Sequence, residues 1–244
     1  MPEPGLLTPD WPAPPRVRAL QTLRGGGCSP APWDSFNLGD HVGDDPARVA
    51  ANRAALRRRL PAGPVWLRQV HGTVAVDAAI CPENAEADAA FARRPGVVCA
   101  VMTADCLPVL FCDRAGSVVA AAHAGWRGLA AGVLEATVAA FGVPPGELLA
   151  WLGPAIGPAA FEVGDEVRAA FVAGDPEAAA AFAAHAPGKW LADLPQLARR
   201  RLQAAGVGWT GGGEICTYAD PASYFSYRRD GVTGRMATLV WLES

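Results

Sequence analysis

Residues 103–128 read TADCLPVLFCDRAGSVVAAAHAGWRG, and the rest of the chain is interpreted outward from them. Two apolar runs flank the polar tetrapeptide DRAG, and a short loop containing glycine between two such runs predicts a β-hairpin. If Cys112 lies opposite Ser117, then Cys106 falls opposite His123, with their Cβ atoms about 4.5–5.5 Å apart. A thiol and an imidazole at that separation could share a metal ion or act as nucleophile and base. A register different by one residue would instead place them on opposite faces of the sheet.

The composition describes an ordinary globular protein of 244 residues, of which 51% are hydrophobic and 18% charged. The net charge of −3 indicates no overall basic surface for nucleic acid. We find no secretory signal pattern and no uncharged run long enough to span a membrane. The six cysteines form no CxxC pair, so we expect reduced thiols in the cytoplasm rather than a disulfide framework.

Strand-like and helical patterns alternate along the chain. We predict strands near residues 17–23, 65–70, 96–102, 148–152, 207–210, 214–217 and 235–242. We predict helices at 46–60, where Asp45 caps and Pro46 begins the helix, at 125–141, and in three pieces over 164–202. Strands joined both by hairpins and by helices indicate a mixed α/β (α+β) single domain spanning residues 1–244, with a flexible segment at 1–15.

Three candidate metal ligands, His71, Cys106 and His123, each follow an apolar strand-like run. Binding groups are often mounted where strands end, because the scaffold there is rigid. Three nitrogen and sulfur ligands with one open position are typical of a catalytic zinc site, and copper also accepts this donor set. The alternative is two partly buried histidines and one core cysteine, since free cysteine is among the most buried residue types. For the trio taken together, the sequence favours the metal site.

The other polar candidates each have two interpretations. Asp105 could orient a ligand histidine or transfer a proton, or it could be a turn residue that bonds the local backbone. His41 lies in a polar loop with several aspartates, and we interpret it as solvated or facing substrate. His185 lies near the end of a predicted alanine-rich helix, and we interpret it as an ordinary surface residue.

Three arginines are candidates for anion binding. Arg127 lies at the start of a predicted helix, where the N-terminus attracts anions. Arg228 and Arg229 lie among aromatic residues, and paired donors beside rings suit a phosphate or a nucleobase. A surface ion pair is the alternative for each of them. The glycine-rich stretches match neither the dinucleotide-binding fingerprint nor the P-loop.

Seven short strings together resemble a single family. They are FNLGDHVGD at 36–44, RQVHG at 68–72, TADCLP at 103–108, AHAGWRG at 122–128, GPAIG at 153–157, FEVGD at 161–165 and FSYRRDG at 225–231. The family is the laccase-domain family, also called multicopper polyphenol oxidoreductases and now regarded as purine nucleoside phosphorylases. The resemblance runs from about residue 16 to the C-terminus, and the AHAGWRG run with the upstream Asp-Cys pair is highly specific.

The resemblance implies a four-layer fold in which mixed β-sheets pack between helices. It places the metal-binding residues on His71, Cys106 and His123, with zinc as the expected ion and copper as the alternative. It implies phosphorolysis of adenosine, inosine and related nucleosides, with adenosine deamination at the same site. The expected partners are therefore small-molecule purine nucleosides and phosphate. We expect Arg127 or Arg228 to hold the phosphate and Asp105 to assist proton transfer or ligand orientation.

Three other activities are weighed against this one. A laccase holds four copper ions largely with imidazoles, and this chain has four histidines in total, so we reject that mechanism. A metal-free hydrolase could use Cys106 as nucleophile and His123 as base, acting on peptidoglycan precursors. A binding protein with a vestigial site is the remaining alternative.

Overall fold

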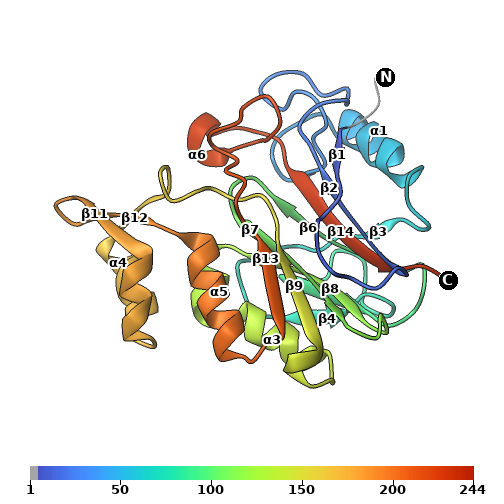
Figure 1. The fold of residues 1–244 in the computed structure, drawn as a ribbon. Coiled ribbons are helices and arrows are strands. Elements are labelled where there is room, and N and C mark those ends of the chain that lie inside the picture. The colour runs from blue at the N-terminus through green and yellow to red at the C-terminus, as the bar shows by residue number, and fades with distance from the viewer. Residues whose placement is uncertain (1–4) are drawn as a thin grey trace.

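Two stacked β-sheets form the centre of the molecule, which the computed structural model describes over residues 5–244 (Figure 1). The first sheet has five strands in the order β1-β2-β14-β6-β3, with β3 parallel to β6 and the other neighbours antiparallel. These strands are β1 Leu6–Leu7, β2 Val17–Thr22, β14 Met236–Leu242, β6 Val98–Thr103 and β3 Pro64–Val65. Because β14 lies between β2 and β6, the first and last parts of the chain share one sheet.

The second sheet has six strands in the order β13-β9-β7-β8-β5-β4 and contains the hairpin predicted from the sequence. Its strands are β13 Trp209–Gly212, β9 Leu148–Leu152, β7 Leu107–Asp113, β8 Val119–Ala124, β5 Ala89–Ala92 and β4 Ala75–Asp77. The outer pairs β13–β9 and β4–β5 are parallel, whereas the central pairs are antiparallel.

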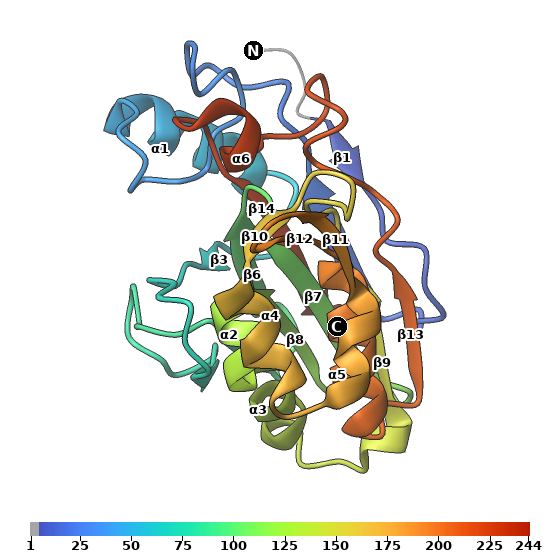
Figure 2. The same cartoon turned by 90° about the vertical axis from the view of Figure 1, so that its left-hand side faces the viewer.

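Helices cover the outer faces of the two sheets. They are α1 Pro46–Arg57, α2 Trp126–Ala131, α3 Val133–Ala140, α4 Asp165–Val172, α5 Leu194–Ala204 and α6 Tyr227–Asp230, with 3₁₀ turns at Pro145–Glu147 and Pro176–Ala181. A small sheet of β10 Glu162–Gly164, β12 Lys189–Ala192 and β11 Phe182–Ala186 lies beside α4. Figure 2 shows α2, α3 and α5 in front of the six-stranded sheet. Among the described residues, no helix is long and apolar enough to cross a membrane.

Side chains alternate in direction along the central strands, and this alternation builds three stacked cores. In β6, Ala100 belongs to the core beneath α1, whereas Val101 belongs to the core between the two sheets. In β7, Leu110 lies in that same inter-sheet core, and the ring of Phe111 lies 6.0 Å from that of Phe141 in the core under the helices. The layers are therefore helix, five-stranded sheet, six-stranded sheet and helices, which confirms the predicted mixed α/β fold.

Most of the predicted elements form close to their expected positions. The strands at 17–23, 96–102, 148–152, 207–210 and 235–242 correspond to β2, β6, β9, β13 and β14. Helix α1 begins as predicted, with Pro46 in the first turn and the Asp45 carboxylate accepting a hydrogen bond from the amide of Ala47. The flexibility expected for residues 1–15 stays a prediction, although Leu6–Leu7 within that segment pairs with β2.

The predictions over residues 125–141 and 164–202 need correction. The single helix expected at 125–141 is two helices, α2 and α3, because Gly132 adopts a left-handed φ of +106° that interrupts it. The hairpin β11–β12 replaces part of the predicted helical region, so His185 lies on a strand and not at a helix end. Alanine-rich composition favours a helix locally, but here pairing between the strands overrides that preference.

The edges of the sheets were predicted less well than their centres. The strand expected at 65–70 is reduced to β3 and a single bridge between Arg68 and Glu86. The strand expected at 214–217 is a single bridge between Cys216 and Ala155. The short strands β4 and β5 were missed, since three or four residues carry too little alternation to be recognised.

The predicted hairpin exists, but its register differs from the prediction by two residues. Cys112 lies opposite Val119 and Pro108 lies opposite His123, so Cys106 lies beyond the paired region. The carboxylate of Asp113 accepts hydrogen bonds from the Ser117 hydroxyl and from the amides of Ser117 and Val118, which lengthens the turn. A shift of two residues preserves the face on which each side chain lies.

We predict that Asp113→Ala lowers the free energy of unfolding by about 2 kcal/mol, because the buried amide of Val118 and the two donors of Ser117 then lose their acceptor. Urea denaturation followed by tryptophan fluorescence measures this. Arg114→Ala, in the exposed part of the same turn, is the control and should change stability by less than about 0.5 kcal/mol. Equal effects of the two substitutions would contradict this account of the turn.

Candidate metal centre

Three separate parts of the fold bring His71, Cys106 and His123 together. His71 lies in the loop after β3 with a left-handed φ of +60°, Cys106 lies between β6 and β7, and His123 lies on β8. The Cys106 Sγ atom is 3.8 Å from His71 Nε2, and the two imidazole ring centres are 4.8 Å apart. One ligand atom from each residue lies within 4.8 Å of the others. The structure thus assembles the trio that the sequence predicted.

The spacing of these atoms fits a single metal ion. Zinc binds sulfur at about 2.3 Å and imidazole nitrogen at about 2.0 Å, so tetrahedral ligands of these two types lie roughly 3.6 Å apart. The Sγ–Nε2 separation of 3.8 Å between Cys106 and His71 is close to that value. The three residues can therefore hold a metal and leave a fourth position open.

Asp88 connects the two histidines and was not predicted as a site residue. Its carboxylate accepts a hydrogen bond from His123 Nδ1 at 2.8 Å. It also accepts hydrogen bonds from three consecutive amides, those of Val70, His71 and Gly72, at 3.2, 2.9 and 2.6 Å. The Asp88 side chain is fully buried, so one enclosed charge fixes both the His71 loop and the orientation of the His123 ring.

The contact with Asp88 determines which nitrogen of His123 is available. An ionised carboxylate only accepts hydrogen bonds, so His123 Nδ1 carries the proton and Nε2 keeps its lone pair for a metal. Burial opposes ionisation of Asp88, but the hydrogen bonds from His123, Gly72 and Val70 outweigh it and hold the pKa of this carboxyl below its usual value. The only sequence signal was an aspartate placed directly before the apolar run that forms β5.

Two glycines of the AHAGWRG motif are required by close approach of the His71 loop. A Cβ atom at Gly125 would lie 2.7 Å from His71 Cδ2 and 3.0 Å from Cys106 Sγ. A Cβ atom at Gly128 would lie 2.9 Å from the carbonyl oxygen of Gly72. These distances are shorter than van der Waals contact, so larger residues would push the candidate ligands apart.

Without a metal, Cys106 and His123 favour opposite charges. Burial alone would raise the pKa of the Cys106 thiol, but the two histidines outweigh it and lower this pKa to about 6. Burial likewise opposes the charge on His123, but the Cys106 thiolate and Asp88 raise its pKa to about 9. A thiolate is the form of cysteine that binds metal or attacks an electrophile, so both chemistries remain open at this point.

The trio lies in a cavity of about 640 Å³. The residues that line it are Asp40, His41, Leu67, Arg68, Gln69, His71, Asn84, Met102, Thr103, Ala104, Cys106, His123, Tyr227 and Arg235. His41 therefore faces the cavity, which agrees with its interpretation as solvated or facing substrate. His185 lies elsewhere, 3.5 Å from Glu162.

Asp105 contacts neither histidine. Its buried carboxylate accepts hydrogen bonds from the hydroxyls of Thr217 and Ser226 and from the amide of Arg228. It thereby ties the segment that carries α6 to the start of β7. Asp88, and not Asp105, orients the ligand histidine, which corrects one of the two interpretations of Asp105. Proton transfer by Asp105 stays a prediction.

The arginines nominated from the sequence point elsewhere. Arg127 is exposed and stacks on the Trp126 ring at 4.4 Å. Arg228 donates to the carbonyl groups of Ala160 and Glu162, and Arg229 pairs with Asp230. None of the three lines the cavity, where the arginines are Arg68 and Arg235. Phosphate binding by Arg127 or Arg228 stays a prediction.

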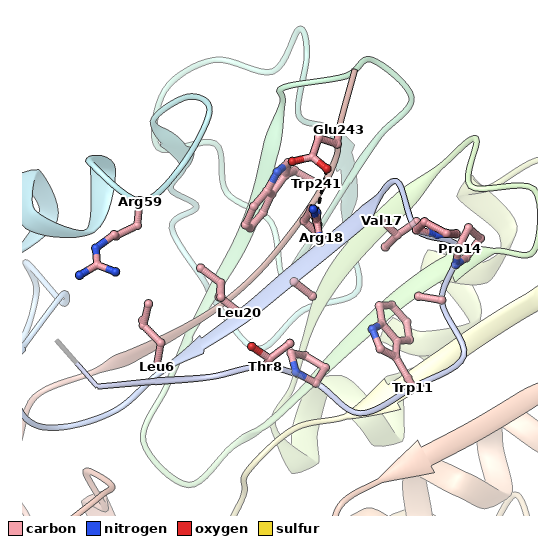
Figure 3. A pocket seen from close by; sticks show the side chains of 14 residues that line it. Leu6, Thr8, Trp11, Pro14, Val17, Arg18, Leu20, Arg59, Trp241 and Glu243 are labelled. Atoms are coloured by element: carbon pink, nitrogen blue, oxygen red, sulfur yellow. Dashed lines mark hydrogen bonds and ion pairs between the residues drawn. The ribbon is translucent and has the colours of Figure 1, made fainter. Parts of the chain in front are cut away.

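A second cavity of about 540 Å³ lies beside β2 of the five-stranded sheet (Figure 3). Trp11, Val17, Leu20 and Trp241 contribute to its lining, as do Arg18 and Glu243, which form an ion pair at 2.8 Å. Its lining includes neither histidine nor cysteine among the described residues. Of these two cavities, the first is the one that holds the candidate metal ligands.

We predict that metal-free protein is alkylated by iodoacetamide at Cys106 with a rate that rises through about pH 6 and then levels off. The reason is that the thiolate predominates above the lowered pKa of Cys106. Cys81 is the internal control, because burial and Asp77 raise the pKa of its thiol. Peptide mass spectrometry of timed reactions follows both cysteines. A Cys106 rate that still climbs between pH 8 and 9 would contradict the prediction.

We predict that Asp88→Asn weakens metal binding about 10–100-fold, because the histidines lose the charge that orients them. Competition with a chromophoric chelator measures the dissociation constant. The matched control is Asp77→Asn on the adjacent strand β4, whose carboxylate accepts from the amide of Ala79 outside the cavity. Unchanged affinity in Asp88→Asn would show that Asp88 does not support the site.

Comparison with known proteins places the chain among named relatives. Residues 18–243 match the profile of a family described as multi-copper polyphenol oxidoreductase laccase. A protein of Pseudomonas aeruginosa named purine nucleoside phosphorylase is 61% identical over 239 residues, covering 97% of this chain and 98% of that protein. The purine nucleoside phosphorylase YfiH of Escherichia coli is 57% identical over 240 residues, covering 97% and 98%.

Solved structures show the same fold. The protein NMB0706 of Neisseria meningitidis superimposes with a TM-score of 0.95 at 55% identity, covering 98% of this chain and 99% of that one. YlmD of Geobacillus stearothermophilus superimposes with a TM-score of 0.91 at 31% identity, covering 98% and 97%. As the sequence motifs predicted, the chain belongs to the multi-copper polyphenol oxidoreductase laccase family.

Proposed function

We propose that this protein is a metal-dependent purine nucleoside phosphorylase that converts adenosine, inosine and related nucleosides to the free base and ribose 1-phosphate. The observation that carries the proposal is the His71–Cys106–His123 trio, which lies in a cavity. The chain that holds it is 61% identical to a protein named for this activity. The mixed nitrogen and sulfur donors favour zinc, with copper as the alternative.

The cavity has the size and lining that a nucleoside requires. Its volume of about 640 Å³ lies within the roughly 300–1,000 Å³ of small-molecule sites. Tyr227 lines it, and its ring is 61% exposed and so is available for stacking against a purine. Asp105 positions this ring indirectly, because its carboxylate holds Ser226 and the amide of Arg228 on either side of Tyr227.

In phosphorolysis, a phosphate oxygen forms a bond to C1′ of the ribose while the bond from C1′ to N9 breaks. The bonding electrons leave with the purine, which takes up a proton. When bound, the metal supplies a Lewis acid and a water of lowered pKa, and the second role would serve adenosine deamination at the same site. The protein contributes by holding the purine against Tyr227 and by keeping the three ligands fixed through Asp88.

The proposal predicts that metal-loaded protein releases hypoxanthine from inosine only when phosphate is present. Chromatography of the reaction measures the release. His71→Ala should abolish it, because two ligands do not hold the ion as three do. His185→Ala is the matched control and should retain the activity, because that histidine lies on β11 away from the cavity. Removal of the metal with a chelator should stop the reaction, and added zinc should restore it.

Two results would contradict the proposal. Absence of hypoxanthine from fully metal-loaded protein with inosine and phosphate would exclude the phosphorylase. Full activity in demetallated protein would exclude the metal and favour the Cys106–His123 nucleophile, for which the lowered pKa of the Cys106 thiol is the supporting observation.

A further inference from the structure

Arg235 is a half-buried cation that lines the same cavity as the candidate metal ligands. It lies just before β14, the strand that pairs with β6 at the centre of the five-stranded sheet. Its Nη1 atom donates to the carbonyl groups of Thr233 and Gly234, both at 3.1 Å. Its guanidinium lies 5.9 Å from the centre of the Tyr227 ring. The cation thus shares one cavity with the Tyr227 ring and with the candidate metal ligands.

The two cavity arginines differ in their partners. Arg68 forms an ion pair with Glu86. Within the described residues, Arg235 has no carboxylate within ion-pair distance, and its Nε and Nη2 atoms make no hydrogen bond. Burial lowers the pKa of Arg235, and the charges of Cys106 and Asp105 partly offset that effect. Partial burial of a guanidinium without an anionic partner is unfavourable, and an anionic ligand in the cavity would supply the missing charge.

The backbone holds Arg235 rigidly in this position. Its amide donates to the side chain of Asn37, and its carbonyl accepts from the amide of Leu38. A Cβ atom at Gly39 would lie 2.8 Å from Arg235 Cγ, so glycine at that position leaves room for the arginine stem. The FNLGDH motif therefore holds Arg235 in position through Asn37, Leu38 and Gly39. A side chain fixed in this way loses little conformational entropy when it binds a ligand.

A second unsatisfied polar group belongs to a residue of the same cavity lining. Thr103 also lines the cavity, and it lies opposite Met236, the residue next to Arg235, in the β6–β14 pairing. Its hydroxyl oxygen is buried and has no hydrogen-bond partner in the described part of the chain. Such orphaned groups are uncommon in folded proteins, and they often mark a place where a ligand or water completes the hydrogen bonding.

We infer that Arg235 forms the subsite for inorganic phosphate, in place of Arg127 or Arg228. The inference rests on the proposed phosphorylase function and assigns its anionic substrate to a part of the cavity. Guanidinium groups bind phosphate through two parallel hydrogen bonds, and Nε and Nη2 of Arg235 are the pair of donors available for this. Arg235 takes no part in bond breaking; it binds the phosphate that attacks C1′.

The test measures the KM for phosphate at saturating inosine in Arg235→Gln and Arg235→Lys. We expect Arg235→Gln to raise this KM at least about tenfold, since a charge-assisted hydrogen-bonded pair is lost. Arg235→Lys should recover part of the loss because it keeps the charge. The KM for inosine and the melting temperature should change little, whereas a purely structural arginine would alter the melting temperature and both KM values together.

The matched control is Arg93→Gln. Arg93 also donates to two carbonyl groups, those of Ala140 and Phe141, and stacks on the ring of Phe91, but it lies outside the cavity. This substitution should leave the KM for phosphate unchanged. The inference is wrong if Arg235→Gln leaves the KM for phosphate as unchanged as Arg93→Gln does. It is also wrong if Arg235→Gln weakens binding of inosine 5′-monophosphate but not of inorganic phosphate.

Calorimetric titration of the metal-loaded protein with inorganic phosphate separates this inference from the proposed function. If the protein binds phosphate about tenfold more tightly than Arg235→Gln does, the subsite is supported even when no hypoxanthine is released. If hypoxanthine is released but both proteins bind phosphate equally, the function stands and the subsite is overturned. Absence of phosphate binding by the unaltered protein also overturns the subsite.

Discussion

The buried carboxylate of Asp88 is the constraint on which the candidate site depends. It lies at the start of β5, directly across from His123 on β8, and it receives the His123 ring proton and three amides of the His71 loop. A fully buried negative charge is stable only when its hydrogen bonds are satisfied, so the loop, the ring and the carboxylate must be ordered together. His71 thereby keeps a left-handed backbone, which is uncommon for residues other than glycine. The geometry of the two imidazoles is thus determined by one side chain that binds neither metal nor substrate.

The stacked sheets bring the remaining groups to this point. Strands β6, β7 and β8 are almost wholly buried and deliver Thr103, Cys106 and His123 at their ends, while β14 delivers Arg235 from the other end of the chain. Gly125 and Gly128 then allow the start of α2 to pack against the His71 loop without steric conflict. The ligands are therefore attached to a rigid core. Because the core is rigid, the ligands keep their geometry when no ion is bound.

The centre of the fold and the metal trio were predictable because their signals are strong. Long apolar runs and the motif around His123 identified β6, β7, β8 and the three candidate ligands. The hairpin register was off by two residues because the side-chain bonds of Asp113 lengthen the turn. Asp88 and Arg235 escaped prediction because their roles come from contacts with segments distant in sequence. The helix prediction around His185 failed because alanine content says little about pairing between β11 and β12.

The central claim is that His71, Cys106 and His123 jointly hold one metal ion, and X-ray absorption spectroscopy at the zinc edge tests it most directly. For protein loaded with one equivalent of zinc, the account predicts one sulfur neighbour at about 2.3 Å and two imidazole nitrogens at about 2.0 Å, with a lighter atom in the fourth position. In Cys106→Ser the sulfur neighbour should disappear. A spectrum of the unaltered protein without a sulfur neighbour, or with only oxygen neighbours, would contradict the account.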